Sequence, residues 1–335
     1  MTCWCSNTNL QSFNEDYALC EKCGTLISLK GISQEKIHVV DDNTDYYGKN
    51  YWLNDTAEES NTFPDIFYRS RLDPTERNLH WLKTLLKYLH PPAKILEIGA
   101  GCGSFVAMLN QIGFDAQGME LSPWVVDYAK EQFKVPMTVG TIEQSNYEPQ
   151  SFDAIVLMDV FEHLSNPVQT LQHCLKLLKP EGFLLMQTPQ FQPDINYEEL
   201  VKTNAPFLSM LVPEGHLYLF SQASIKHVLA ENGCSFVAFE PSIFVYDMTV
   251  VASRQTLQSH DWAISEAELL KNPQKRFILA LLDLRAREQE IIVHFNEAAT
   301  SRDAYKQEVQ HLKASMPIGK RIMRVLENRA RRYLR

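Results

Sequence analysis

The chain has 335 residues, of which 45% are apolar and 22% are charged, and this balance is typical of a folded globular protein rather than a disordered one. It contains no run of about eighteen apolar residues that would predict a membrane-spanning helix, and its first residues do not resemble a signal peptide. The net charge of -9 argues against a broad nucleic-acid-binding surface, so we expect a cytoplasmic protein with no nucleic-acid partner.

Four cysteines lie close together in the first segment, residues 1–40. They are spaced as C-x-C and C-x-x-C: Cys3, Cys5, Cys20 and Cys23. In an intracellular chain this pattern favours metal ligands over disulfides, and four thiolates suit a structural Zn²⁺ ion with tetrahedral geometry. The segment is too short to form a core, so the metal would supply its folding energy; the alternative is a reduced tail without fixed structure.

Residues 41–73 form a connector that is rich in aromatic side chains. They are Tyr46, Tyr47, Tyr51, Trp52, Phe63, Phe67 and Tyr68. Two interpretations are open: the connector is a lid over an active site, or it packs between the cysteine segment and the core. A helix is predicted from Pro74 to Leu89, because Asp73 and Pro74 suit the N-cap and the first helical position.

Residues 74–253 alternate between strand and helix patterns. Strands are predicted at 94–98, 115–120, 136–140, 153–158, 182–188, 235–240 and 246–252. Helices are predicted to begin near Ser104, Ser122, Asn166 and Ser221. At Ser122 and Asn166 a capping side chain precedes a proline, which is a typical helix start. The alternation predicts an α/β fold in which a parallel sheet has helices on both faces.

The first two strands of this region carry the most informative motif, ILEIGAGCGSF at 95–105 followed by GMELSPW at 118–124. Its key residues are Glu97, Gly99, Ala100, Gly101, Gly103 and Glu120. Glycine lets a ligand approach the backbone closely, and a carboxylate that ends the second strand can accept hydrogen bonds from ribose hydroxyls. The spacing G-x-G-x-G differs from the G-x-G-x-x-G of dinucleotide sites. The acidic residue ahead of it would repel a pyrophosphate but suits an ammonium group.

With this motif the chain resembles the class I S-adenosylmethionine-dependent methyltransferases over about residues 75–252. The resemblance implies a doubly wound, Rossmann-like sheet of seven strands, in which the last two strands form a hairpin that inserts an antiparallel strand. It also implies S-adenosylmethionine as the cofactor. The alternative is a Rossmann-like turn that binds another nucleotide.

The resemblance implies roles for single residues. Cofactor contacts are implied for Glu97, Gly99, Ala100, Gly101, Gly103, Glu120, Leu121, Thr141, Ile142 and Asp159. Glu97 lies near the methionine amino group in this interpretation, Glu120 binds the ribose, and Leu121 packs beside the adenine. The segment GTIE at 140–143 stands where the family has an aspartate for the adenine, and Asp159 faces the methionine end.

Two histidines are the candidate catalytic residues. His216 lies in the insertion after the fifth strand, which in this fold covers the acceptor pocket, and it is the candidate general base. His163 lies in DVFEHL at 159–164. A similar stretch in ubiquinone-pathway O-methyltransferases implies a divalent cation at Asp159, Glu162 and His163. The alternative for each histidine is a structural role.

After Ser253 the pattern changes to one long amphipathic segment, residues 254–316. Apolar residues recur there with four-three spacing: Phe277, Leu281, Leu284, Ile291, Phe295, Ala298, Tyr305, Val309 and Leu312. This spacing predicts a long helix or coiled-coil strand that packs on the body or on a partner subunit, and we favour a homo-oligomer contact. The tail, residues 317–335, has seven basic residues and one acidic residue. It either contacts the inner face of an anionic membrane peripherally or forms a solvated end helix.

The acceptor is expected to be a small molecule, preferably a sugar of a glycan or glycolipid precursor. A cysteine knuckle before a methyltransferase core is similar to the deoxysugar C-methyltransferases and to methyltransferases of bacterial polysaccharide and glycolipid assembly. Aromatic residues of the insertion would suit a ring-shaped or sugar acceptor: Phe191, Tyr197, Phe207, Tyr218 and Phe220. The alternatives are O-methylation of a quinone-like phenol and a non-catalytic scaffold with this fold.

Overall fold

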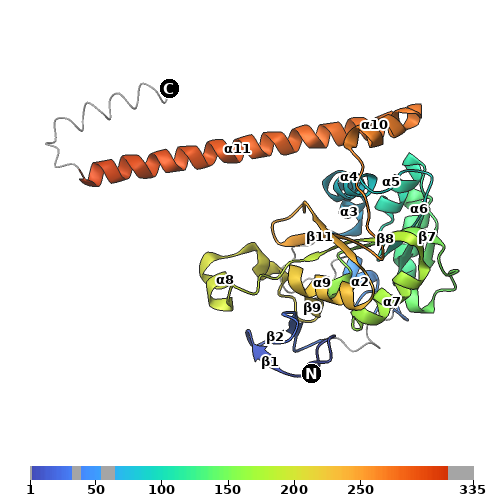
Figure 1. Cartoon of the computed structure of the whole chain (residues 1–335), viewed down its shortest axis with the longest axis horizontal. Helices are drawn as coiled ribbons and strands as arrows, with labels where there is room; N and C mark the ends of the chain where they lie inside the picture. The colour runs from blue at the N-terminus through green and yellow to red at the C-terminus, as the bar shows by residue number, and fades with distance from the viewer. Residues whose placement is uncertain (1, 32–38, 54–64, 316–335) are drawn as a thin grey trace. The chain divides into compact units, whose positions relative to one another are not determined.

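The computed structural model describes residues 2–31, 39–53 and 65–315 (Figure 1). The chain divides into two units, Met1–Leu281 and Leu282–Arg335. None of the helices in the described ranges is long and apolar enough to cross a lipid bilayer. The basic tail, residues 317–335, lies outside the described residues, as does the middle of the aromatic connector.

The main sheet of the first unit has seven strands in the order β10-β11-β8-β7-β4-β5-β6. They are β4 (Lys94–Ile98), β5 (Asp115–Glu120), β6 (Met137–Val139), β7 (Phe152–Met158), β8 (Leu178–Pro189), β10 (Phe236–Glu240) and β11 (Asp247–Ser253). Strands β4 to β8 pair in parallel, whereas β11 runs antiparallel between β8 and β10. The predicted α/β sheet with an inserted antiparallel strand is therefore confirmed.

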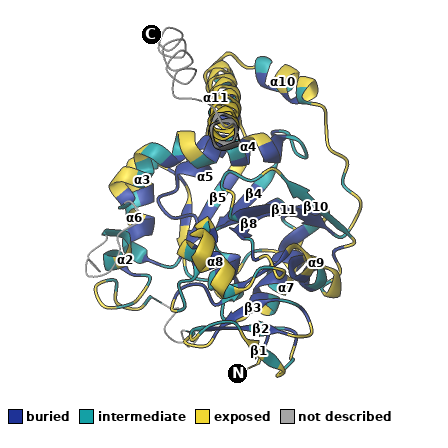
Figure 2. Cartoon of the chain, turned by 90° about the vertical axis from the view of Figure 1, so that its left-hand side faces the viewer, coloured by how far each residue is buried: buried dark blue, intermediate teal, exposed yellow. Residues whose placement is uncertain are grey.

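The inner strands of this sheet are largely buried, because helices cover both faces and little water reaches them. Ile155 and Val156 of β7 and Leu184 and Leu185 of β8 are fully buried, and Figure 2 shows the inner strands in the colour for buried residues. Such continuous apolar runs are why the strands were recognisable from the sequence.

The helices of the core begin at or next to the predicted residues. They are α5 (Ser104–Ile112), α6 (Pro123–Phe133), α7 (Pro167–Leu177) and α9 (Gln222–Glu231). The side chains of Ser122 and Asn166 each accept a hydrogen bond from a backbone N–H in the first turn, and each precedes a proline. Ser221 forms a capping box with Ser224.

The helix predicted to start at Pro74 starts earlier, and Asp73 is not its cap. The structure has α3 (Ile66–Asp73), a π-helical turn η1 (Pro74–Asn78) and α4 (Leu79–Leu86), with Asp65 as the N-cap of α3. Asp73 has helical dihedral angles, and Arg69 and Arg77 pair with its carboxylate. The wide π turn accommodates the proline within a continuous helical path.

A second, small sheet contains the cysteine segment. Its order is β1-β2-β3-β9, from β1 (Leu10–Ser12), β2 (Tyr17–Cys20), β3 (Leu26–Ser28) and β9 (Tyr218–Leu219). The strand β9 comes from the insertion after β8, which also contains α8 (Tyr197–Thr203) and the 3-10 turn η4 (Pro206–Met210). The sequence did not predict that this insertion completes the N-terminal sheet.

The remaining helices are short, apart from one. They are α2 (Lys49–Leu53), the 3-10 turns η2 (Ile142–Gln144), η3 (Phe161–His163) and η5 (Pro273–Lys275), α10 (Trp262–Leu270) and α11 (Arg276–Ser315). The long helix predicted from the four-three spacing is present as α11. Leu284, Ile291, Phe295 and Tyr305 are each more than half exposed on it.

Candidate active site

The glycine turn joins the end of β4 to the start of α5, and all three glycines have positive φ. A Cβ on Gly99 would lie 2.5 Å from Cγ2 of Val160, and a Cβ on Gly101 would lie 2.9 Å from the ring of Trp52. Both the dihedral angles and the close neighbours therefore require glycine at these positions.

Glu97 is a buried carboxylate at the end of β4. It is 4% exposed, and its Oε2 atom has no hydrogen-bond partner among the described residues. Burial raises the pKa of Glu97 well above its usual value, and the charge of Glu120 raises it further. A buried carboxylate oxygen without a partner fits a cationic group of a ligand, such as the ammonium of S-adenosylmethionine.

Glu120 ends β5 and faces the glycine turn. Its Oε2 accepts a hydrogen bond from the Gly101 amide at 3.0 Å, and its Oε1 accepts one from the Leu121 amide at 2.7 Å. Burial raises the pKa of Glu120, and these backbone donors partly oppose that shift. The two bonds fix the carboxylate, and each oxygen keeps a lone pair that can accept a hydrogen bond from a ligand hydroxyl.

The segment expected beside the adenine follows β6, the neighbour of β5. The Gly140 amide donates to the backbone oxygen of Glu120 at 2.9 Å, Thr141 comes next, and Ile142 is buried. Glu143 accepts a hydrogen bond from the hydroxyl of Thr170 on α7. The structure thus brings Thr141 and Ile142 to the same sheet edge as Glu120, and it engages Glu143 elsewhere.

Asp159 follows β7 and has a φ of 56°, which is uncommon for a residue other than glycine. Its Oδ2 accepts a hydrogen bond from Arg77 at 2.7 Å, and its Oδ1 accepts one from the Gln187 amide nitrogen at 2.9 Å. Gln187 in turn accepts from the indole N–H of Trp81 at 2.9 Å. This network was not foreseen from the sequence, because its members are far apart in the chain.

The two candidate histidines lie side by side, with ring centroids 4.8 Å apart. His216 donates from Nδ1 to the backbone oxygen of Met210 at 2.7 Å, since a carbonyl oxygen can only accept. Its Nε2 atom therefore carries the lone pair. His163 Nδ1 lies 2.9 Å from the Gly215 oxygen and 3.1 Å from the Tyr47 hydroxyl. Burial lowers the pKa of both rings, that of His163 to about 3, so both are neutral near pH 7.

Glu162 is a buried carboxylate beside the two histidines. It is 1% exposed, its Oε2 accepts from the Thr188 hydroxyl at 3.0 Å, and its Oε1 lies 3.9 Å from His163 Nε2. Burial, followed by the charge of Asp159, raises the pKa of Glu162 well above its usual value. One atom each of Glu162, His163 and His216 lies within 4.8 Å of the others, a set that could hold a divalent cation. The sequence suggested Asp159 as the partner of Glu162 and His163, whereas the structure places His216 beside them.

The described part of the aromatic connector contacts both the glycine turn and His163. Trp52 packs on the glycine turn, and the Arg69 guanidinium lies 5.4 Å above its ring. Tyr47 reaches His163, while the Asp42 carboxylate accepts from the side chain of Ser122 and from the backbone of α6. Arg69, Arg77 and Asp42 were not singled out from the sequence, which has no local motif around them.

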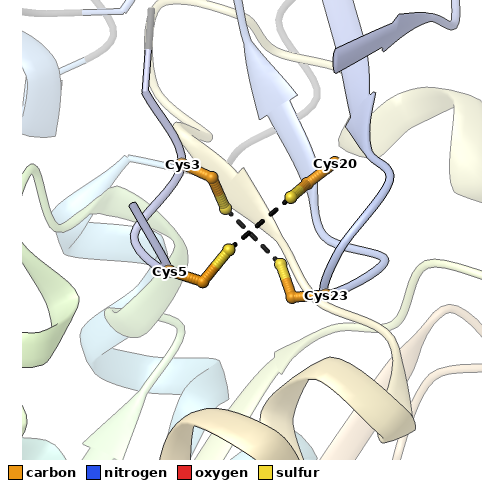
Figure 3. Close-up of side chains that lie close together, drawn as sticks. All are labelled: Cys3, Cys5, Cys20 and Cys23. Atoms are coloured by element: carbon orange, nitrogen blue, oxygen red, sulfur yellow. Dashed lines mark hydrogen bonds between the residues drawn. The ribbon is translucent and has the colours of Figure 1, made fainter. Parts of the chain in front are cut away.

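The four cysteines of the first segment converge on one point (Figure 3). Cys3 Sγ lies 3.4 Å from Cys23 Sγ, and Cys5 Sγ lies 3.6 Å from Cys20 Sγ. All four side chains are buried, and their sulfur atoms are within 4.8 Å of one another. Four thiol groups placed around a common centre are a suitable ligand set for tetrahedral zinc.

Comparison with known families agrees with this geometry. A family model described as a methyltransferase domain matches residues 68–238, about half of the chain. The chain belongs to this methyltransferase family. The family expected from the glycine motif is therefore confirmed.

Curated relatives match a smaller part of the methyltransferase. A ubiquinone biosynthesis O-methyltransferase of Xanthomonas campestris pv. campestris (strain B100) is 29% identical over 131 residues, 37% of this chain and 54% of the relative. The protein of the same name from Xanthomonas axonopodis pv. citri (strain 306) is 28% identical over 155 residues, 43% of this chain and 64% of the relative. The chain spans about half the length of the first of these relatives.

Solved structures are similar at lower identity. Magnesium protoporphyrin IX methyltransferase from Synechocystis PCC 6803 with bound SAH has 17% identity and a TM-score of 0.42, covering 58% of this chain and 90% of that one. A protein from Pyrococcus horikoshii OT3 has 18% identity and a TM-score of 0.42, covering 58% of this chain and 100% of that one.

Proposed function

We propose that this methyltransferase transfers a methyl group from S-adenosylmethionine to a hydroxyl group of a small molecule. The observation that carries the proposal is the pair of buried carboxylates, Glu97 and Glu120, on either side of the glycine turn, with one Glu97 oxygen left for a ligand. When bound, S-adenosylmethionine supplies an electrophilic methyl group on a positively charged sulfur. Glu97 would hold its ammonium group and Glu120 its ribose hydroxyls.

His216 is the proposed general base. Its Nε2 lone pair can accept the proton of an acceptor hydroxyl, and its lowered pKa keeps that atom unprotonated near pH 7. The Met210 carbonyl, 2.7 Å from Nδ1, fixes the tautomer and stabilises the imidazolium that forms. His163 and Tyr47 line the same side of the site, where they would position the acceptor.

The acceptor class has two candidates. The printed name of the curated relatives, ubiquinone biosynthesis O-methyltransferase, supports a quinone-like phenol. The cysteine segment ahead of the methyltransferase core supports a sugar of a glycan or glycolipid precursor. Because a phenol and a sugar both offer a hydroxyl, the proposed role of His216 is the same for both.

A second mechanism is favoured by the cluster of Glu162, His163 and His216. A divalent cation held by these three groups would bind a phenolate oxygen and lower the pKa of the acceptor hydroxyl. His216 would then be a ligand instead of a base. The two mechanisms differ in metal requirement, which makes them separable.

Calorimetry on the purified full-length chain tests the function directly. S-adenosylmethionine should bind, and Glu120→Ala should weaken binding at least about tenfold, because the ribose loses charge-assisted hydrogen bonds. Glu143→Ala is the matched control: the Glu143 carboxylate bonds to Thr170, so the affinity of this variant for S-adenosylmethionine should be unchanged. If the wild-type chain binds no donor, a non-catalytic scaffold is the better interpretation. Methyl transfer to a panel of catechols and nucleotide-linked sugars, followed by mass spectrometry, then identifies the acceptor.

We also propose that the four cysteines hold structural zinc, because their sulfur atoms converge on one point.

We propose in addition that α11 pairs with a second copy of the chain. This proposal rests on the exposed apolar residues that recur along α11 with four-three spacing. Truncation after Leu281 should reduce the oligomer to a monomer in size-exclusion chromatography with light scattering. An unchanged mass would contradict the pairing.

We propose further that the basic tail adds peripheral contact with an anionic membrane, on the charge of residues 317–335 alone. The full chain should sediment with vesicles that contain an anionic lipid and remain free with neutral vesicles. A chain that ends at Met316 should bind neither. Equal binding of both chains would contradict a membrane role for the tail.

A further inference from the structure

The cysteine segment is joined to the acceptor side of the site by backbone pairing. Strand β3 pairs antiparallel with β9, with Leu26 opposite Leu219 and Ile27 opposite Tyr218. One position further, the Ser28 amide donates to the Leu217 oxygen at 3.0 Å. The strand that the insertion contributes to the small sheet thus begins two residues after His216.

A buried tyrosine makes the same connection through its side chain. The Tyr17 hydroxyl donates to the backbone oxygen of His216 at 3.0 Å, although the two residues are 199 positions apart. Tyr17 is fully buried, and the Ser28 hydroxyl donates to the oxygen of Pro213 nearby. In addition, the Leu217 amide donates to the backbone oxygen of Glu162 at 2.8 Å. The segment 213–217 is therefore fixed between the cysteine sheet and the turn η3.

The cysteines fix the strands that make these contacts. Cys20 ends β2, and Cys23 lies in the turn that leads into β3. The turn is closed by hydrogen bonds at 2.9 Å from the Gly24 amide to the Cys20 oxygen and from the Cys20 amide to the Thr25 oxygen. The strands of this sheet are only two to four residues long, and the four cysteines lie in or beside them, so we expect the four-thiolate site to contribute to its stability.

We propose that the zinc-loaded cysteine segment positions the acceptor side of the active site, with β3 and Tyr17 holding the segment that carries His216. Tyr17 is a positioning residue in this proposal, since its hydroxyl bonds to the backbone oxygen of His216. The donor residues Glu97 and Glu120 belong to β4 and β5 of the main sheet. The metal state of the cysteines thus controls the acceptor side while the donor side stays intact. The catalytic role that this inference gives to His216 rests on the proposed function.

Hydrogen exchange of the full chain, with and without a zinc chelator, tests the connection. After zinc removal, amides in 17–28 and in 213–219 should exchange at least about tenfold faster together, while 94–120 keeps its protection. Retained protection of 213–219 when 17–28 is released would overturn the proposal, as would loss of protection throughout the chain. A chain that neither contains nor takes up zinc would overturn it too.

A conservative variant tests Tyr17 by itself. Tyr17→Phe keeps the ring and removes the hydroxyl bond to the His216 backbone, so the ring of His216 should shift and its NMR signals should move at constant pH. The signals are recorded on histidine-labelled protein, with the His216→Gln spectrum assigning them. Tyr147→Phe, which removes a hydroxyl bond to Thr138, is the control and should leave the His216 signals unchanged. Unchanged His216 signals in Tyr17→Phe would refute the positioning role.

Donor affinity separates this proposal from the proposed function. Tyr17→Phe and the zinc-free chain should bind S-adenosylmethionine within about twofold of the wild type, because Glu97 and Glu120 are held by the main sheet. If the wild type binds no donor, the proposed function fails, and the exchange experiment still decides whether the cysteine segment holds residues 213–219.

Discussion

Arg77 and Asp159 form an ion pair at 2.7 Å although they are 82 positions apart in the chain. Asp159 occupies a left-handed backbone conformation that costs a non-glycine residue of order 1–3 kcal/mol and persists where the surroundings fix it. Arg77 and Gln187 occupy both carboxylate oxygens and so fix the side chain. The carboxyl end of β7 is therefore held in a strained form at the edge where Glu97 and Glu120 lie.

Replacing Arg77 should lower stability more than replacing a surface partner. Arg77→Met leaves Asp159 beside Glu162 and Asp247 without its cation, so the free energy of unfolding should fall by about 1–3 kcal/mol in urea denaturation. Lys179→Met removes a more exposed pair with Asp153 and should cost less than about 1 kcal/mol. Equal losses of unfolding free energy in the two variants would show that the Arg77 pair contributes no more to stability than the more exposed pair.

Asp247 should make stability depend on pH. Burial, followed by the charge of Asp159, raises the pKa of Asp247 to about 8. The folded chain therefore holds this proton between about pH 4 and 8, whereas the unfolded chain releases it near pH 4. The contribution is fully present below about pH 4 and is lost as the pH rises toward 8. The difference in unfolding free energy between wild type and Asp247→Asn should accordingly shift in favour of the variant over this range. A difference that is constant with pH would contradict the raised pKa.

The local part of the active site could be predicted from the sequence, and the long-range part could not. Glu97, the three glycines and Glu120 lie on one strand–turn–helix–strand unit, so their spacing alone fixes their proximity. The strands were recognisable because parallel strands read as short apolar runs. By contrast, the pairing of Arg77 with Asp159 depends on how α3, η1 and α4 pack, which no local pattern encodes.

The same limit explains two of the differences between expectation and structure. Asp73 and Pro74 look like a helix start, yet the helix continues across them because Arg69 and Arg77 compensate the Asp73 carboxylate. The insertion after β8 was expected to cover the acceptor, but its two-residue strand β9 was too short to show a period. Its pairing with β3 is visible only in the folded chain.

Gly101 should be needed for donor binding as well as for the turn. Gly101→Ala places a Cβ 2.9 Å from the Trp52 ring at a φ of 50°, so both strain and displacement of the ring are expected. Calorimetry should show at least about a tenfold loss of affinity for S-adenosylmethionine. Gly233→Ala is the matched control, since its φ of 92° is also positive but nothing lies within 4 Å of the added Cβ. It should lower stability by about 1 kcal/mol and leave affinity unchanged. Equal loss of affinity in both variants would assign the effect to folding.

Metal content should distinguish the two mechanisms at the acceptor side. If His216 is the base, the purified chain should hold one zinc ion, because its Nε2 lone pair cannot bind a metal and accept a proton at once. Cys20→Ser should lose this ion, whereas Cys234→Ser should keep it, since Cys234 is buried in the main core. In the cobalt-substituted chain, four thiolates give intense absorption bands that carboxylate and imidazole ligands do not. The chain could instead hold a second equivalent of metal that has weak bands and is lost in His216→Gln. That result would contradict the role of His216 as the base and favour a cation held by Glu162, His163 and His216.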